Sequence, residues 1–226
     1  SRGNVIYAED LVHHFGVDAV RYYSLHEMPY ANDGTITYDV FINRYNSDLA
    51  NTLGNLVNRT VAMINKYFDG IVPENSCAGE FDESLKEVCI SASEKIEAKM
   101  KTWHIADSLD EIWKIVDRAN KYIDETTPWI LAKTEEDKPR LGTVLYNLAE
   151  AIRIIASLLS SFMPETADKI KAQIGSTDLS YESVKTFGGL KPGTKVGAAE
   201  VLFARIDAAK KLEELEAEQS ADEPES

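Results

Sequence analysis

Hydrophobic positions along the chain repeat mainly at the spacing of an α-helix. The same period predicts helices over 8–15, 18–28, 83–101, 105–124, 140–162 and 198–217, and a short helix beginning at Pro128. An alternating segment at 35–38 is the best candidate for a strand. In the segment 39–68, the positions that form one helix face are spaced three or four residues apart throughout. They are Phe41, Tyr45, Leu49, Leu53, Leu56, Thr60, Ile64 and Phe68.

Long amphipathic helices joined by short connections predict an all-α fold, an antiparallel helical bundle. We expect four regions. Residues 1–38 form a small α-rich region in front of the bundle, and residues 39–175 form the bundle itself. Residues 176–212 form a loop, rich in glycine, and a C-terminal helix that packs back on the bundle. Residues 213–226 contain seven acids and no base, which is typical of a solvated linker.

Charge changes the picture in two ways. The 226 residues hold 24 Lys and Arg against 38 Asp and Glu, so the net charge is −14, which argues against a general basic surface for nucleic acid. The segment 39–68 nevertheless has three bases against two acids. No apolar run approaches the roughly 18–20 residues that span a bilayer, and no signal peptide is visible. We therefore expect a cytoplasmic protein with no membrane partner. Cys77 and Cys89 are predicted to be reduced thiols without a metal.

Candidates for catalysis are scarce, since the sequence has no metal-binding, nucleophile-elbow or phosphate-loop motif. Two features suit RNA bases better. Asn55 and Arg59 lie one turn apart beside the apolar stripe and offer donors and acceptors for base edges. Trp129 follows Pro128 at a helix start, where an indole can stack on an unpaired base. The common alternative for an Asn–Arg pair one turn apart is a surface hydrogen bond, and for a tryptophan at a helix start it is a core anchor. Trp103 and Trp113 are assigned to the core. Spacing alone leaves an unassigned helical bundle.

Short motifs at the start of the chain resemble class I aminoacyl-tRNA synthetases. The segment 1–6, Ser-Arg-Gly-Asn-Val-Ile, resembles the stretch after their Lys-Met-Ser-Lys signature, with Ser1 as the last residue of that loop. The segment 18–23, Asp-Ala-Val-Arg-Tyr-Tyr, resembles their Asp-Ala-Leu-Arg-Tyr element.

Later motifs resemble the methionyl-tRNA synthetase family specifically. They are Asn-Ser-Asp-Leu-Ala-Asn-Thr-Leu-Gly-Asn-Leu-Val-Asn-Arg at 46–59 and Tyr-Ile-Asp-Glu-Thr-Thr-Pro-Trp at 122–129, followed by Ala132 and Lys133. The segment 202–207, Leu-Phe-Ala-Arg-Ile-Asp, is similar to the family's Phe-Pro-Arg-Ile-Asp, with Ala204 in place of the proline.

The resemblance implies a stem-contact fold followed by a bundle that reads the CAU anticodon. It implies that Trp129 stacks on the cytosine and that Asn55 and Arg59 hydrogen-bond to anticodon base edges. Pro128, Asp124 and Asn120 are implied to support this corner, the last two as buttresses.

The resemblance also implies that the full-length enzyme attaches methionine to tRNA(Met) using ATP with Mg. We expect no catalytic residue, cofactor or activity in this chain alone. The implied partners are the tRNA(Met) anticodon stem-loop and the catalytic domain of the same parent chain. Oligomeric state and a following OB-fold domain that dimerises stay open. The alternatives are the bundle of a cysteine- or valine-type class I synthetase, and a helical protein-interaction module, which predicts no tRNA affinity.

Overall fold

A computed structural model describes residues 6–27 and 36–222, with side chains described up to residue 218; the predicted loop remnant at Ser1 lies outside these ranges. Within them the regular structure is helical, apart from one antiparallel bridge between Ile71 and Lys195. The all-α prediction is therefore confirmed. The elements are α1 (Ala8–Phe15), α2 (Val17–Glu27), α3 (Tyr38–Arg44), the π-helix η1 (Tyr45–Gly54), α4 (Asn55–Phe68), α5 (Asp82–Met100), α6 (Ile105–Thr126), α7 (Pro128–Leu131), α8 (Lys138–Leu159), α9 (Pro164–Ile174), the 3₁₀ turn η2 (Tyr181–Lys185) and α10 (Ala208–Asp222).

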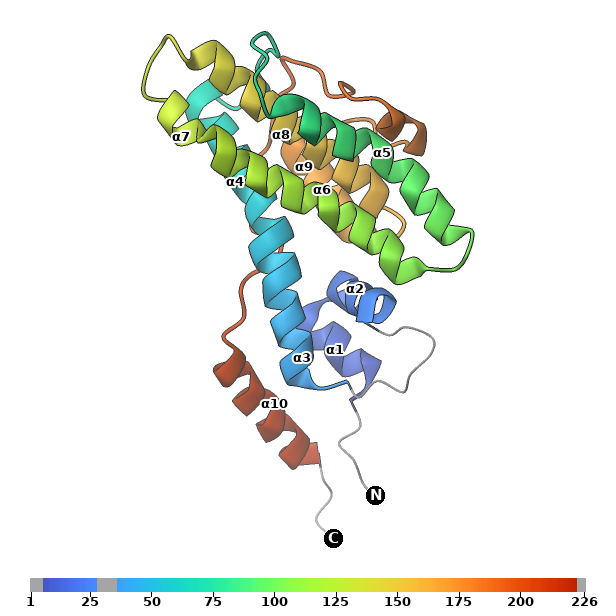
Figure 1. The fold of residues 1–226 in the computed structure, drawn as a ribbon. Coiled ribbons are helices and arrows are strands. Elements are labelled where there is room, and N and C mark those ends of the chain that lie inside the picture. Colours follow the sequence, from blue (N-terminus) through green and yellow to red (C-terminus); the bar gives the residue numbers. More distant parts are fainter. Residues whose placement is uncertain (1–5, 28–35, 223–226) are drawn as a thin grey trace.

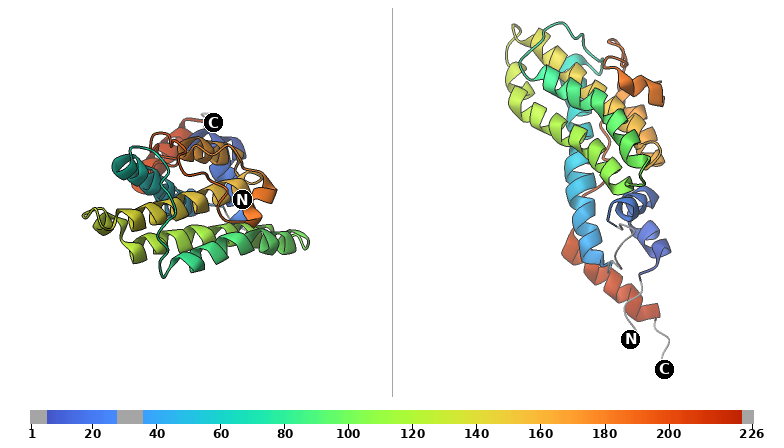
Figure 2. Two further views of the ribbon diagram at one scale, coloured as in Figure 1. Left: turned by 90° about the horizontal axis from the view of Figure 1, so that it is seen from above. Right: turned by 45° about the vertical axis from the view of Figure 1, so that its right-hand side comes forward.

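The helices form two groups at opposite ends of an elongated molecule (Figure 1). The bundle of α4, α5, α6, α8 and α9 occupies one end, with α7 at its edge, while α1, α2, α3 and α10 lie towards the other. A single continuous rod made of α3, η1 and α4 joins the two groups, as the right-hand view of Figure 2 shows.

The central helix of the bundle is α8, and it is buried from Leu141 to Leu159. By length and apolar composition it passes a test for a membrane-spanning helix, so the expectation that no run approaches that length is wrong. In the sequence, Glu150 and Arg153 interrupt the apolar run, which is why it was not recognised as long. All of the apolar window lies inside the protein, which is the position of a core helix.

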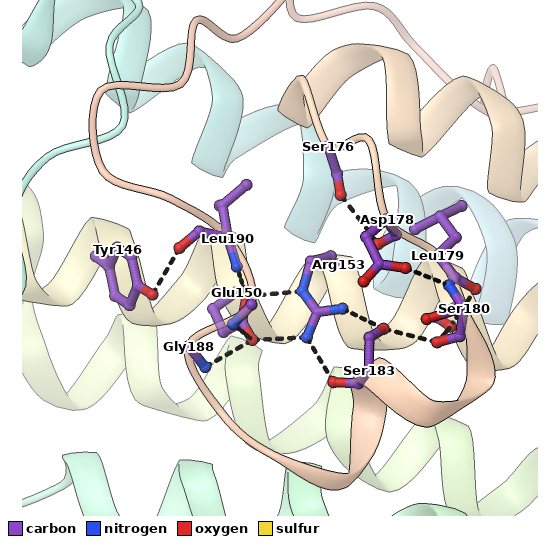
Figure 3. A network of polar contacts seen from close by, with 12 residues as sticks. Tyr146, Glu150, Arg153, Ser176, Asp178, Leu179, Ser180, Ser183, Gly188 and Leu190 are labelled. Atoms are coloured by element: carbon purple, nitrogen blue, oxygen red, sulfur yellow. Dashed lines mark hydrogen bonds and ion pairs between the residues drawn. The ribbon is translucent and has the colours of Figure 1, made fainter.

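Those two charged residues organise the predicted loop 176–197 (Figure 3). Arg153 donates two hydrogen bonds of 2.8 Å to the Glu150 carboxylate, and both side chains are almost wholly buried. The carboxylate also accepts the backbone amides of Gly188, Gly189 and Leu190, each at 2.8 Å. A buried charge is tolerated only when it is paired and hydrogen-bonded, and here the loop supplies the remaining partners.

The predicted helix 39–68 is a single rod, but its middle ten residues are π-helical. A step of four residues turns an α-helix about 40° too far, so the repeated fours from Phe41 to Leu53 drift around an ideal α-helix. The wider π-helical turn keeps these side chains on one buried face. The apolar stripe was therefore correctly identified, and the α-helical period was not.

One other prediction near this rod is wrong. The strand candidate at 35–38 fails in its described part, because Tyr38 begins α3 and Thr37 caps it by accepting from the Val40 amide. The remaining position, 35, lies outside the described residues. Helix α9, which begins at Pro164, was not predicted from the sequence.

The last predicted helix begins ten residues late, at Ala208. Residues 198–207 instead run along the rod and α9, held by amide side chains. Asn46 exchanges two hydrogen bonds with the backbone of Ile206, at 2.8 and 2.9 Å. Gln173 does the same with Glu200, at 3.1 and 3.3 Å. These bonds satisfy backbone groups that a helix would otherwise satisfy, so tertiary contacts override local propensity.

Candidate nucleic-acid interface

The turn between α6 and α7 is sharp and is built by two consecutive residues. Thr127 adopts a left-handed conformation, with φ 44° and ψ 60°, which is unusual for a β-branched side chain. Its amide donates to the carbonyl of Ile123 at 2.9 Å and closes α6. Pro128 follows as the first residue of α7, where its fixed φ suits a helix start. The predicted break between the two helices is confirmed.

Trp129 is presented by this turn at the surface. Its side chain is only partly covered, with 41% of the residue exposed, and the neighbouring Ile130 is 49% exposed. The guanidinium carbon of Arg59 lies 5.9 Å from the centre of the indole. A cation over an aromatic face at this distance is attracted by about 0.5–1 kcal/mol at an exposed site. The structure thus brings together two of the three predicted base-reading residues, from α4 and α7.

Asn55 is the first residue of α4, directly after the π-helical segment, and its side chain is exposed one turn before Arg59. The interior neighbours Leu56 and Thr60 are fully buried, so the pair flanks the core stripe as predicted. The rotation of this turn depends on η1, since one additional residue in a helix rotates everything after it by about 100°.

Helix α6 fixes η1 through side chains that bond to its carbonyls. The Asn120 amide donates to the carbonyl of Thr52 at 3.2 Å, and the Trp113 indole donates to that of Asp48 at 3.3 Å. Trp113 is thus partly buried between elements, in line with the prediction. Asn120 holds the rod close to the end that carries Asn55, whereas Asp124 is exposed one turn further along α6.

Behind the turn lies a buried polar network that sequence reasoning missed. Asp82, at the start of α5, receives two 2.8 Å bonds from Arg140 of α8 and a 2.6 Å bond from the Tyr122 hydroxyl of α6. It also accepts the Gly79 amide at 2.9 Å. The partners are 40 and 58 residues away in sequence, so no local pattern could reveal them.

The ionisation of this network follows from its geometry. Burial alone raises the pKa of Asp82, but the bonds from Arg140, Tyr122 and Gly79 outweigh it, so the pKa lies below its ordinary value. Burial, followed by the hydrogen bond to Asp82, raises the pKa of Tyr122. The carboxylate therefore stays charged and the hydroxyl neutral. The network connects α5, α6 and α8 near the end of α6, where the chain turns into α7.

Trp103 is exposed, so its assignment to the core from the sequence is wrong. It is 77% exposed at the turn between α5 and α6 and adopts a left-handed φ of 61°. The prediction failed because a tight helix-to-helix connection, rather than a buried face, determines where this residue points. It lies at the far end of α6 from Trp129.

Other chemistry in the described residues is limited. Burial raises the pKa of the Cys89 thiol, and Cys77 is half-buried; both thiols are free, and Cys89 packs in the core. His14, Glu214 and Glu218 place one ligand atom each within 4.8 Å of one another, the spacing of a cation site. The ammonium group of Lys211 already supplies the positive charge at this place, because it lies 3.0 Å from His14 Nδ1 and 3.1 Å from Glu214.

Comparison with known proteins gives a consistent family. A family model described as the anticodon binding domain of methionyl tRNA ligase matches residues 72–222, and a model of class I tRNA synthetases (M) matches residues 1–61. Methionine–tRNA ligase of Clostridium acetobutylicum is 52% identical over 215 residues, covering 95% of this chain and 33% of that protein. The Bacillus subtilis ligase is 44% identical over 216 residues, covering 94% of this chain and 32% of that protein.

Solved structures agree with this. Mycobacterium tuberculosis methionyl-tRNA synthetase in complex with methionyl-adenylate superimposes with a TM-score of 0.84 at 34% identity, over 90% of this chain and 40% of that one. The chain spans about a third of the length of the curated relatives that it matches.

Proposed function

The chain belongs to the methionyl-tRNA synthetase family and contains its anticodon-binding domain, and we propose that this domain reads the CAU anticodon of tRNA(Met). In this proposal the indole of Trp129 stacks on the cytosine. Arg59 and Asn55 donate and accept hydrogen bonds at the edges of the anticodon bases. Pro128, Asp124 and Asn120 hold the corner in shape.

The single observation that carries the proposal is the pairing of Arg59 with a half-exposed Trp129. A partly exposed indole with a guanidinium over its ring can stack with one further flat group. A base stacked on an aromatic ring contributes about 1–3 kcal/mol. Arg59 then keeps its planar fork of donors for a base edge, and Asn55 adds one donor and one acceptor from the same helix face.

Charge supports a selective contact over a general one. The protein is strongly acidic, so RNA is repelled by most of its surface, and affinity has to come from a few placed groups. We infer that this chain alone binds RNA weakly.

The parent activity follows from the family. We propose that a full-length protein carrying this chain attaches methionine to tRNA(Met) with ATP, in the cytoplasm, and that its catalytic domain and the tRNA are the partners of this domain. The match to a methionine-specific model disfavours the cysteine and valine types.

A binding assay separates this function from a helical protein-interaction module. The chain is titrated against a CAU stem-loop RNA and against the same stem with a scrambled loop, at low salt. We expect tighter binding of the CAU loop by at least tenfold. Equal binding of the two loops, or no binding of either, would refute anticodon reading and favour the interaction module.

A further inference from the structure

A cleft of about 380 Å³ lies between α5 and α6, away from the corner that carries Trp129. Four basic side chains line it, against two acidic ones, although the whole chain is acidic. The bases are Lys95 of α5 and Lys114, Arg118 and Lys121 of α6, and the acids are Glu111 and Asp117.

One acid of the cleft is already neutralised within the fold. The Glu111 side chain is nearly buried, and Lys114 donates to it at 2.7 Å, with Lys99 3.8 Å away. On the other side, Lys95 and Lys121 are exposed, and Lys121 has only a long contact of 3.8 Å with Glu125. The structure gives Lys95 no ion pair with any residue that it describes. The net charge offered to a ligand is therefore positive.

Arg118 adds a fixed donor group to this charge. Its Nε and Nη2 atoms bind the Ser84 hydroxyl at 3.0 and 2.6 Å, and Nη2 also binds Glu125 at 2.8 Å. Its third nitrogen, Nη1, is buried and has no acceptor among the residues that the structure describes. An anion in the cleft can pair with this donor only once the side chain exposes it, because Nη1 is closed to solvent in this structure.

We propose that this cleft binds a phosphate group of an RNA backbone. The inference rests on the proposed function, because it assigns the cleft to the same RNA whose loop is read at Trp129. Guanidinium and ammonium groups together are suited to a phosphate, the first through directed bonds and the second as point charges. The cleft supplies charge without reading sequence, which is the role of phosphate contacts generally.

Helix α6 connects the two places. It runs from the cleft to the turn before α7 (Figure 1), and its rise of about 1.5 Å per residue puts Lys121 about 8 Å and Lys114 about 18 Å before Thr126, the last residue of α6. A stem that continues from a loop held at Trp129 and follows α6 therefore passes the cleft. Glu125, bonded by Arg118, lies two residues before Thr127, so Arg118 links the cleft to the corner.

The test compares two pairs of lysines. Lys95 and Lys121 are replaced together by alanine, and the control replaces Lys169 and Lys191, which lie on α9 and in the loop 176–197. Each protein is titrated with the CAU and the scrambled stem-loops over a range of salt. We expect the cleft variant to bind both RNAs about tenfold more weakly and to lower the slope of log affinity against log salt by about one to two, since each neutralised phosphate contributes about 0.7–0.9. The control should match the wild type.

Each outcome bears on one proposal only. Cleft variants that bind like the control, with an unchanged salt slope, would overturn the phosphate site even where the CAU loop is preferred. A chain that does not distinguish the loops refutes anticodon reading, while weaker stem binding by the cleft variant still supports the cleft. Titration with inorganic phosphate and with ATP forms the last arm: if either protects the cleft lysines from acylation as well as the stem-loop does at equal concentration, the ligand is a free anion and the backbone assignment is wrong.

Discussion

Replacing Trp129 by alanine removes the proposed stacking platform and little else. The residue is 41% exposed and is the second residue of a four-residue helix, so its loss opens no cavity in the core. A stacked base is worth about 1–3 kcal/mol, which corresponds to an affinity for the CAU stem-loop that is about 5- to 150-fold lower. The variant should also lose its preference for the CAU loop over a scrambled loop.

The chain offers a matched control in Trp103→Ala. This residue is the same type, is more exposed at 77%, and lies at the opposite end of α6. Fluorescence anisotropy of a labelled stem-loop measures binding, and urea unfolding checks that both variants are folded. The reasoning is refuted if Trp129→Ala binds within twofold of the wild type, or if Trp103→Ala loses as much.

Arg59 extends the same experiment to a double-mutant cycle. Because its guanidinium lies 5.9 Å from the Trp129 ring centre, the two substitutions should not be additive. We expect the double variant Arg59→Ala/Trp129→Ala to lose less affinity than the sum of the single losses. Strict additivity would mean that the two side chains bind the RNA independently.

Three further predictions concern the framework. Glu150→Gln should lower the free energy of unfolding by about 3–5 kcal/mol, because it leaves Arg153 charged and buried without its partner. Glu182→Gln, at an exposed position in the loop 176–197, should change that free energy little. Urea denaturation measures both, and a loss below about 1 kcal/mol for Glu150→Gln would contradict the network. The pKa of Asp82 is lowered in the folded protein, so its charge contributes fully to the free energy of unfolding above the unfolded pKa of about 4, and this contribution is lost as the pH falls below that value. The difference in the free energy of unfolding between wild type and Asp82→Asn should therefore narrow between pH 5 and about pH 2. A constant difference would show that the charge is unimportant. Thr127→Gly should raise the urea midpoint slightly, because glycine adopts the left-handed conformation without strain, and a clear loss of stability would show that the threonine side chain supports the turn.

The sequence predicts most of the fold because the hydrophobic period is strong. The long helices α5, α6 and α8 of the bundle and the break at Pro128 follow from local rules. The failure near the C-terminal end has a cause that is distant in sequence. At 198–207, amide side chains of Asn46 and Gln173 hold the backbone in an irregular path, and no rule of local propensity includes partners so distant in sequence.

The candidate site divides in the same way. Spacing places Asn55 and Arg59 on one face of a helix, and the proline predicts where Trp129 begins the next. Their approach across two helices depends on the π-helical segment and on the left-handed Thr127. The four-residue steps before Leu53 do not reveal that π-helix, because the same steps from Leu56 to Phe68 lie in the regular α-helix α4. The supporting contact between Asp82 and Arg140 leaves no trace in the pattern.

Photo-crosslinking tests the central claim most directly. A CAU stem-loop that carries 5-iodocytidine at the anticodon cytosine is bound to the chain, irradiated and digested, and the linked peptide is identified by mass spectrometry. The account predicts a crosslink at Trp129 that is absent when the same modified base is moved into the stem. A crosslink at Trp103 or elsewhere in the chain, with none at Trp129, would contradict it.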